Sequence, residues 1–160
     1  MKSITATAYT LKCVATNREF EDTGWLLEDS QSDEPSLVRA VYKNKQLELK
    51  GDEYGLYTFC DWLPVSRALK GSAAPVTFRS EGLGKHLGLN NLYITLNGYS
   101  PRHGAAMTTC SFKETEAFSV CGRAKADEKR VLVVASAGNT ARAFARVCSE
   151  NNIPLLLSVP

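Results

Sequence analysis

The sequence has little net charge and no long apolar run. It carries 19 basic and 17 acidic residues, a net charge of +2, which gives no reason to propose nucleic acid or an acidic membrane as a partner. No run approaches the roughly 18 apolar residues of a membrane span. The start, "MKSITATAYTLKC", lacks a continuous apolar core, so no signal peptide is expected.

The sequence also lacks the patterns of a metal or hydrolase site. It has five cysteines, an odd number, and no Cys-x-x-Cys pair. Both features disfavour a disulfide framework or a closed zinc site. A reduced, cytoplasmic protein without metal is the expectation, with most cysteines acting as small buried hydrophobes. The two histidines have no Ser or Asp partner at a recognisable spacing, so packing or surface roles are expected. These residues are Cys13, Cys60, Cys110, Cys121, Cys148, His86 and His103.

What is present indicates a globular chain of 160 residues, enough for one domain or one and a fragment. We divide it into an N-terminal strand and loop segment, 1–70, and an α/β region, 71–160. In the first segment, strands are expected at 4–15, 37–42 and 45–49, and a polar loop at 21–36. Residues 55–66 are predicted as a loop that Trp62 anchors on the core, the alternative being a loop that covers something flat and apolar.

The second segment begins with two strand-like runs, "PVTFRS" (75–80) and "NLYITLNG" (91–98). Between them, "EGLGKHLGL" (81–89) imitates a dinucleotide-binding fingerprint, but its third glycine, Gly88, comes one place too late. We interpret it as a helical turn, and 99–107 as a loop.

The last thirty residues give the clearest pattern, a β-loop-α-β unit. "RVLVVA" (130–135) and "IPLLLSV" (153–159) are typical of strands buried on both faces of a parallel sheet. The helix between them places apolar residues on one face, namely Ala141, Phe144, Ala145 and Cys148. "SAGNT" (136–140) forms a turn at the carboxyl end of the first strand, where α/β sheets bind ligands and where helix amides favour anions. A capped turn without any ligand explains the motif equally well.

A second motif, "MTTCSFKETEA" (107–117), places Lys113 at an expected helix start. Ser111 and Glu114 fit a capping box, and the expected core face comprises Ala117, Val120, Cys121 and Ala124. The helix dipole disfavours a cation at this end, which hints at a function. If such a lysine is desolvated beside a second cation, it can form a Schiff base with an aldehyde. Considered by itself, an ordinary solvated lysine is the commoner explanation.

Together, "SFK" and "SAGNT", with Asn139 standing 26 residues after Lys113, resemble the fold-type II pyridoxal-phosphate enzymes, the α/β group of threonine synthase and cysteine synthase. Within that group, "GLYTFCDWLPV", "PVTFRSEGLGKHLGLNNLYITLNGY", "TCSFKETEA" and "VVASAGNTARAFARVC" look most like cysteate synthase. The resemblance covers 55–160 well and the first fifty residues loosely. Thr16 stands where relatives often carry the second cysteine of a zinc ribbon, and no glycine-rich phosphate loop follows. We therefore expect the N-terminal part of a longer enzyme, inactive when isolated.

The resemblance implies pyridoxal 5'-phosphate as cofactor, held covalently by the catalytic Lys113 and hydrogen-bonded by Asn139. It implies that Ser136, Ala137, Gly138 and Thr140 hold the substrate carboxylate. The implied reaction replaces the phosphate of O-phospho-L-serine with sulfite, giving L-cysteate for coenzyme M synthesis, in a homo-oligomer. Two alternatives stay open: threonine synthase acting on O-phosphohomoserine, and an inactive truncated relative that serves as a binding module.

Overall fold

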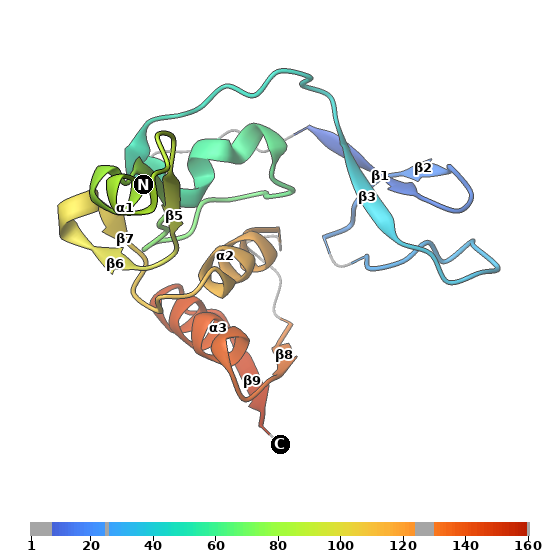
Figure 1. Cartoon of the computed structure of the whole chain (residues 1–160). Helices are drawn as coiled ribbons and strands as arrows, with labels where there is room; N and C mark the ends of the chain where they lie inside the picture. The colour runs from blue at the N-terminus through green and yellow to red at the C-terminus, as the bar shows by residue number, and fades with distance from the viewer. Residues whose placement is uncertain (1–7, 25, 124–129, 160) are drawn as a thin grey trace. The chain divides into compact units, whose positions relative to one another are not determined.

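The computed structural model describes residues 8–24, 26–123 and 130–159 (Figure 1). Within them, helices and short strands form a mixed α/β structure that divides into two compact units. The first comprises Met1–Leu69 and Ser119–Arg130, and the second comprises Lys70–Phe118 and Val131–Pro160. The proposed division at residue 70 stays a prediction.

A three-stranded antiparallel sheet, ordered β2-β1-β3, forms the first part of unit 1. Its strands are β1 (Tyr9–Cys13), β2 (Glu19–Phe20) and β3 (Val38–Tyr42). The strand expected at 37–42 and the described part of that at 4–15 are confirmed, as is the loop at 21–36, of which residue 25 lies outside the described residues.

The strand expected at 45–49 is wrong. Its backbone amides donate to side chains instead of a neighbouring strand: that of Gln46 to Asn44 Oδ1 (3.2 Å) and that of Glu48 to Asp61 Oδ2 (3.1 Å). Side chains of this kind compete with ladder hydrogen bonds.

The segment predicted as a loop at 55–66 is largely a 3₁₀ helix, η1 (Asp52–Trp62), broken at Gly55 with φ 57°. Trp62 does not anchor it, because the indole is 44% exposed and only its Nε1 donates to Asn44 O (3.1 Å). Tyr57, which is 1% exposed, occupies the core in its place.

The end of helix α2 (Lys113–Arg123) is tied into unit 1 by polar contacts. Arg123 donates through Nε and Nη2 to both carboxylate oxygens of Asp22 at 2.7 Å, and to Leu26 O at 2.9 Å. The Tyr9 hydroxyl donates to the same carboxylate at 2.6 Å. Asp22 is nearly buried, with a side chain 5% exposed, so this cluster joins the sheet to the helix through desolvated charges.

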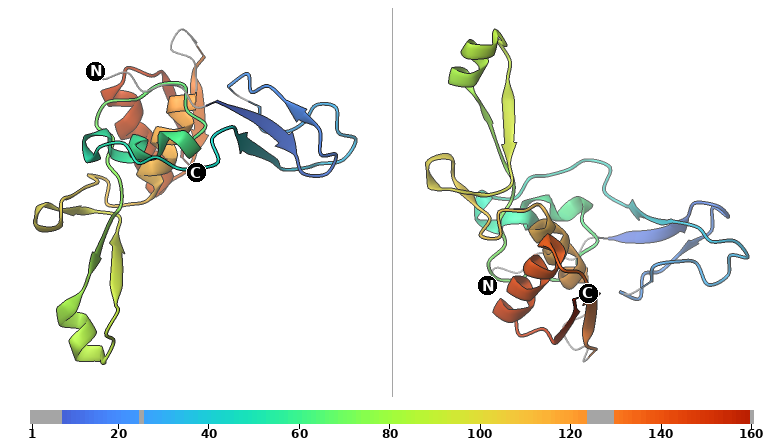
Figure 2. Two further views of the ribbon diagram at one scale, coloured as in Figure 1. Left: turned by 90° about the horizontal axis from the view of Figure 1, so that it is seen from above. Right: turned by 60° about the horizontal axis from the view of Figure 1, so that its bottom comes forward.

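Unit 2 begins with an antiparallel pair, β4 (Val76–Arg79) and β5 (Tyr93–Leu96), with helix α1 (Glu81–Leu87) between them in sequence. In both views of Figure 2, α1 lies at the tip of this hairpin. These elements confirm the strands and helical turn predicted at 75–98.

The region 99–107 is more ordered than the predicted loop. Two short strands, β6 (Tyr99–Ser100) and β7 (Ala105–Ala106), pair around a 3₁₀ turn, η2 (Pro101–His103). Gly104 ends the turn with φ 71°, which glycine adopts without strain. His103 stacks on Phe78 with centroids 4.0 Å apart, so its predicted packing role is confirmed, and His86 is exposed, as expected.

The predicted β-loop-α-β unit is confirmed as β8 (Leu132–Ala135), α3 (Asn139–Glu150) and β9 (Leu155–Ser158), with the two strands parallel. Burial on both faces is wrong. Val133 is 62% and Leu156 57% exposed, whereas Leu132 and Val134 on the opposite face are half-buried. The described residues supply cover on one side only, so burial follows the two-residue alternation of a strand.

The predicted helix faces are partly right. On α2, Ala117 and Cys121 are buried, Val120 is half-exposed, and Ala124 lies outside the described residues. On α3, Ala141, Phe144 and Cys148 are buried and Ala145 is half-exposed. Phe118, Ala143 and Val147, all fully buried, complete the two faces.

Helix α1 and the backbone that follows it approach each other closely at Gly84. A Cβ at Gly84 would lie 2.7 Å from the carbonyl oxygen of Leu89, whereas one at Gly82 in the same helix meets nothing within 4 Å. Gly84→Ala is expected to destabilise the hairpin by about 1–3 kcal/mol through overpacking. The matched Gly82→Ala is expected to stabilise it by about 0.5–1 kcal/mol through helix propensity. Amide hydrogen exchange across 76–96 measures both, and equal protection in the two variants would contradict the contact.

Candidate functional site

Lys113 is the first residue of α2, and the loop before it is held by side-chain hydrogen bonds. The Lys113 amide donates to Ser111 Oγ at 3.3 Å, so Ser111 caps the helix as predicted. The other half of the capping box is wrong, because the Glu114 carboxylate reaches further back. It accepts from the backbone amide of Thr109 (2.8 Å) and from its hydroxyl (2.7 Å).

The Lys113 side chain is one-third exposed. Its Nζ donates to Glu116 Oε2 at 2.5 Å and lies 5.2 Å from the centroid of the Phe112 ring. The group beside this amine is therefore a carboxylate, whereas the Schiff-base argument from the sequence called for a second cation there. The Glu116 side chain is 40% exposed, so this ion pair lies at the surface.

The 136–140 turn presents polar groups at the start of α3. The backbone amide of Ser136 donates to Ser158 O (3.0 Å), and that of Gly138 donates to Ser136 Oγ (3.2 Å). Ala137, Gly138 and Asn139 are exposed. The helix has neither a side-chain cap nor an acidic residue in its first turn, so its positive end is available to an anion. A Cβ at Gly138 would meet nothing within 4 Å, which leaves open space beside the turn.

The structure places both motifs in unit 2. No hydrogen bond or ion pair within the described ranges joins Lys113 to the 136–140 turn. An ion pair between Glu114 of α2 and Arg146 of α3 links the two helices. Asn139 precedes Arg146 by seven residues, or about 10 Å of helix at 1.5 Å per residue.

Glu114 and Arg146 are the polar residues that the sequence reasoning missed. The capping box explains Glu114 only as a helix-start residue, although it precedes Ala117, Phe118 and Cys121 on the apolar face at helical spacing. It is 0% exposed. A carboxylate on the core face of a helix is the sequence feature that could have indicated a buried ion pair.

Two cysteines bear on the predicted chemistry. All five cysteines are free and four are buried, as expected for most of them. Beside the lysine motif, a packing role is the expectation for Cys110, and it is wrong, because Cys110 is exposed and has φ 53°. Hydrogen bonds from Ser36 and Thr16 lower the pKa of Cys13 to about 7. Thr16 donates its backbone amide to Cys13 Sγ at 3.5 Å, where a zinc ribbon would supply a second thiolate.

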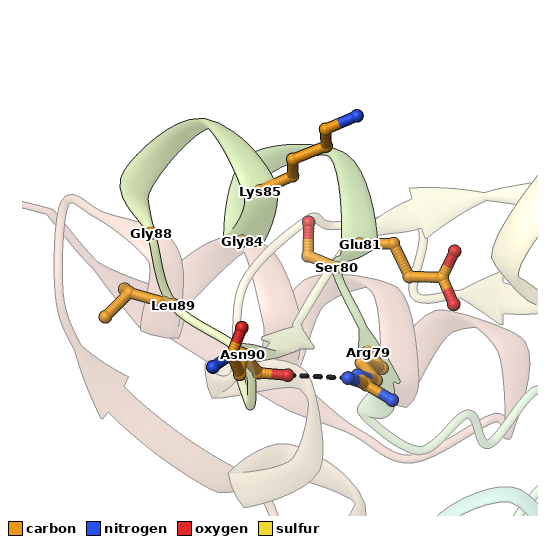
Figure 3. A pocket seen from close by; sticks show the side chains of 8 residues that line it. All are labelled: Arg79, Ser80, Glu81, Gly84, Lys85, Gly88, Leu89 and Asn90. Atoms are coloured by element: carbon orange, nitrogen blue, oxygen red, sulfur yellow. Dashed lines mark hydrogen bonds between the residues drawn. The ribbon is translucent and has the colours of Figure 1, made fainter.

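A cavity of about 390 Å³ lies beside α1 and away from both motifs (Figure 3). Arg79 Nη2 donates across it to Asn90 O at 2.6 Å. None of the predicted site residues lines it; its lining consists of Arg79, Ser80, Glu81, Gly84, Lys85, Gly88, Leu89 and Asn90. The sequence that imitates a dinucleotide fingerprint thus forms this hairpin tip.

The described residues contain neither a cluster that could bind a metal nor a helix that could cross a membrane. No group of three or more His, Cys, Asp or Glu side chains there could hold a metal ion. No helix there combines the length and the apolar character that a bilayer crossing requires.

Comparison with known proteins identifies the chain as similar to a class of enzymes over most of its length. These enzymes are cysteate synthases, so the resemblance found from the motifs is confirmed. The chain is 50% identical over 130 residues to the cysteate synthase of Methanococcoides burtonii, covering 80% of this chain and 31% of the relative. It is 43% identical over 154 residues to that of Methanospirillum hungatei, covering 96% and 36%. The corresponding protein of Methanocella paludicola is 43% identical over 152 residues, covering 95% and 35%.

The chain thus spans about a third of the length of the curated relatives it matches. No family model matches it, and no solved structure matches it either.

The residues present fit part of a pyridoxal phosphate site. An amine that is one-third exposed is available at Lys113, and open space adjoins an anion-accepting helix start at Gly138. These features suit the aldehyde of the cofactor and a substrate carboxylate. The described residues show no comparable cradle for the cofactor phosphate.

Proposed function

We propose that the protein carrying this chain is a pyridoxal-phosphate-dependent cysteate synthase of fold type II. It would convert O-phospho-L-serine and sulfite into L-cysteate and phosphate, a step toward coenzyme M. The observation that carries the proposal is the 50% identity over 130 residues to a curated cysteate synthase. The free cysteines support a reducing, cytoplasmic setting. The proposal includes a homo-oligomer with small-molecule substrates, and no nucleic acid or membrane as a partner.

The chain's own residues have distinct roles in this proposal. Lys113 would be the covalent attachment point for the cofactor and would act as the general base at the α-carbon of the substrate. The backbone amides at the start of α3, with Ser136 and Thr140, bind the substrate carboxylate. The Asn139 side chain would hydrogen-bond the cofactor. When bound, pyridoxal phosphate supplies the electron sink for the carbanion.

The net reaction exchanges one substituent on the β-carbon of the substrate. The C–O bond to phosphate breaks, and a C–S bond to sulfite forms. Loss of the α-proton supplies the electron pair that expels phosphate, and a proton returns to the α-carbon after sulfite adds. In this proposal Lys113 carries the proton in both directions.

The test is an assay on the intact gene product that carries this sequence, supplied with pyridoxal phosphate. We expect phosphate release from O-phospho-L-serine that depends on sulfite, with L-cysteate detected by mass spectrometry. Release from O-phosphohomoserine without sulfite would overturn the proposal in favour of a threonine synthase. Turnover of neither substrate, without any spectral change on adding the cofactor, would indicate a binding module.

A further inference from the structure

We infer that Glu114 and Arg146 form a strut that positions Lys113, and this inference rests on the function proposed above. Glu114 follows Lys113 directly in the sequence, yet its side chain points away from solvent into unit 2. Its side chain is 0% exposed, and that of Arg146 is 16% exposed. Neither residue is given a direct contact with cofactor or substrate; each acts through Lys113.

The first half of the strut fixes the loop that leads into Lys113. Glu114 Oε2 accepts two hydrogen bonds from Thr109, one from the backbone amide at 2.8 Å and one from Oγ1 at 2.7 Å. Two residues later, Ser111 Oγ accepts from the amide of Lys113 itself. The loop is therefore closed onto the first turn of α2 at two points, which sets the direction in which the Lys113 side chain leaves the helix.

The second half connects this turn to α3. Glu114 Oε1 accepts from Arg146 Nη1. The same guanidinium donates to Gly71 O at 2.9 Å and to Glu150 Oε1 at 3.1 Å, and it lies 5.6 Å from the centroid of the Phe118 ring. Three acceptors and a ring thus surround the guanidinium, and among the described hydrogen bonds Glu114 is the acceptor that also bonds the loop before Lys113. A planar fork of this kind constrains its partners more tightly than a lysine would.

Helix α3 connects Arg146 to the 136–140 turn. Arg146 lies two turns after Asn139 on one uninterrupted helix, and a short helix behaves as a rigid rod. The strut therefore fixes how far the Lys113 amine stands from the 136–140 turn. A cofactor held by both motifs needs that separation, and a misplacement of about 1 Å can cost roughly 100-fold in rate.

Stability alone gives little reason for such a pair. Desolvating two charges offsets much of their attraction, and apolar residues of similar volume often stabilise a core as well. A buried carboxylate next to the proposed attachment lysine, satisfied by three donors that come from two separate segments, is better explained by geometry.

The test is Glu114→Gln in the intact protein, compared with Glu150→Gln as a matched control. Both changes remove a carboxylate that pairs with Arg146, but the Glu150 side chain is 42% exposed, and no hydrogen bond among the described residues joins it to the loop before Lys113. Each protein is mixed with pyridoxal phosphate, reduced with borohydride and digested. Mass spectrometry then measures the fraction of label on Lys113 relative to the other lysines, at a temperature where far-UV circular dichroism is unchanged.

We expect Glu114→Gln to lower the Lys113 share about tenfold or more, and Glu150→Gln to leave it near the wild-type value. An unchanged share in Glu114→Gln, even with a lower melting temperature, would overturn the strut while the proposed function stands. If wild-type protein shows no preference for Lys113, the proposed function fails first, and the strut fails with it.

Should Glu114→Gln not fold, Thr109→Val decides the matter. It keeps the amide hydrogen bond to Glu114 and removes only the hydroxyl bond. A reduced share of label on Lys113 in this near-isosteric variant supports the strut, and an unchanged share contradicts it.

Discussion

Replacing Lys113 with alanine is expected to abolish covalent capture of pyridoxal phosphate by the intact protein. The amine is one-third exposed and has one ion-pair partner among the described residues, the exposed Glu116, so an aldehyde can reach it. Without the amine, no other group of the motif can form the bond. The measurement is the absorbance of the bound cofactor at the edge of the visible range, which should appear in wild type and be lost in Lys113→Ala.

A second lysine provides the matched control. Lys85 lies on α1, is exposed and lines the 390 Å³ cavity, so it represents the main alternative place for a ligand. Lys85→Ala is expected to keep the full band. A band that survives in Lys113→Ala but disappears in Lys85→Ala would move the site to the hairpin tip. A band retained in both variants would show that attachment is unselective.

The elements that the sequence predicted well are those set by local pattern. β8, α3 and β9 follow from two apolar β-branched or leucine-rich runs around a helical period of small and apolar residues. The start of α2 follows from Ser111, whose hydroxyl accepts from Lys113. In each case the information lies within a few residues of the element, because hydrogen bonds of helices and caps close over that distance.

The features that could not be predicted depend on distant residues. Glu114 can be buried because Arg146, 32 positions away on α3, donates a hydrogen bond to its carboxylate. No local rule of sequence pairs these two residues. The exposure of Val133 follows from what covers the β8–β9 pair within the described residues, and not from the composition of the strand. The segment 45–49 has the pattern of a strand, but the carboxylate of Asp61 takes the amide of Glu48.

The candidate site shows the same division. Lys113 and Asn139 were identified by motif, and their helical positions were predicted from their neighbours. Their separation could not be, because it depends on how α2 packs against α3. The printed link between the two helices is the Glu114–Arg146 pair, with the Arg146 guanidinium also lying 5.6 Å from the centroid of the Phe118 ring.

The largest expected loss of stability follows from Arg123→Met. Asp22 is 5% exposed and receives two hydrogen bonds from Arg123. Burial alone would raise the pKa of the Asp22 carboxyl, but the hydrogen bonds from Arg123, Tyr9 and Gly24 together hold it below its ordinary value. Removing the guanidinium leaves a buried carboxylate without its cation, which costs about 3–5 kcal/mol. Urea unfolding at pH 7 measures the change.

The pH dependence distinguishes this mechanism from lost packing. A lowered folded-state pKa contributes stability above the unfolded value of about 3.9, and that contribution disappears as pH falls through the folded value. In Arg123→Met the pKa of Asp22 rises, so the stability difference from wild type should shrink as the solution is acidified toward pH 4. Arg123→Lys should lose less, since it keeps a charge without the bidentate fork. Asp22→Asn combined with Arg123→Met should recover part of the loss, because no unpaired carboxylate remains. A double variant no more stable than Arg123→Met, with a loss independent of pH, would show that the arginine acts through its aliphatic contacts.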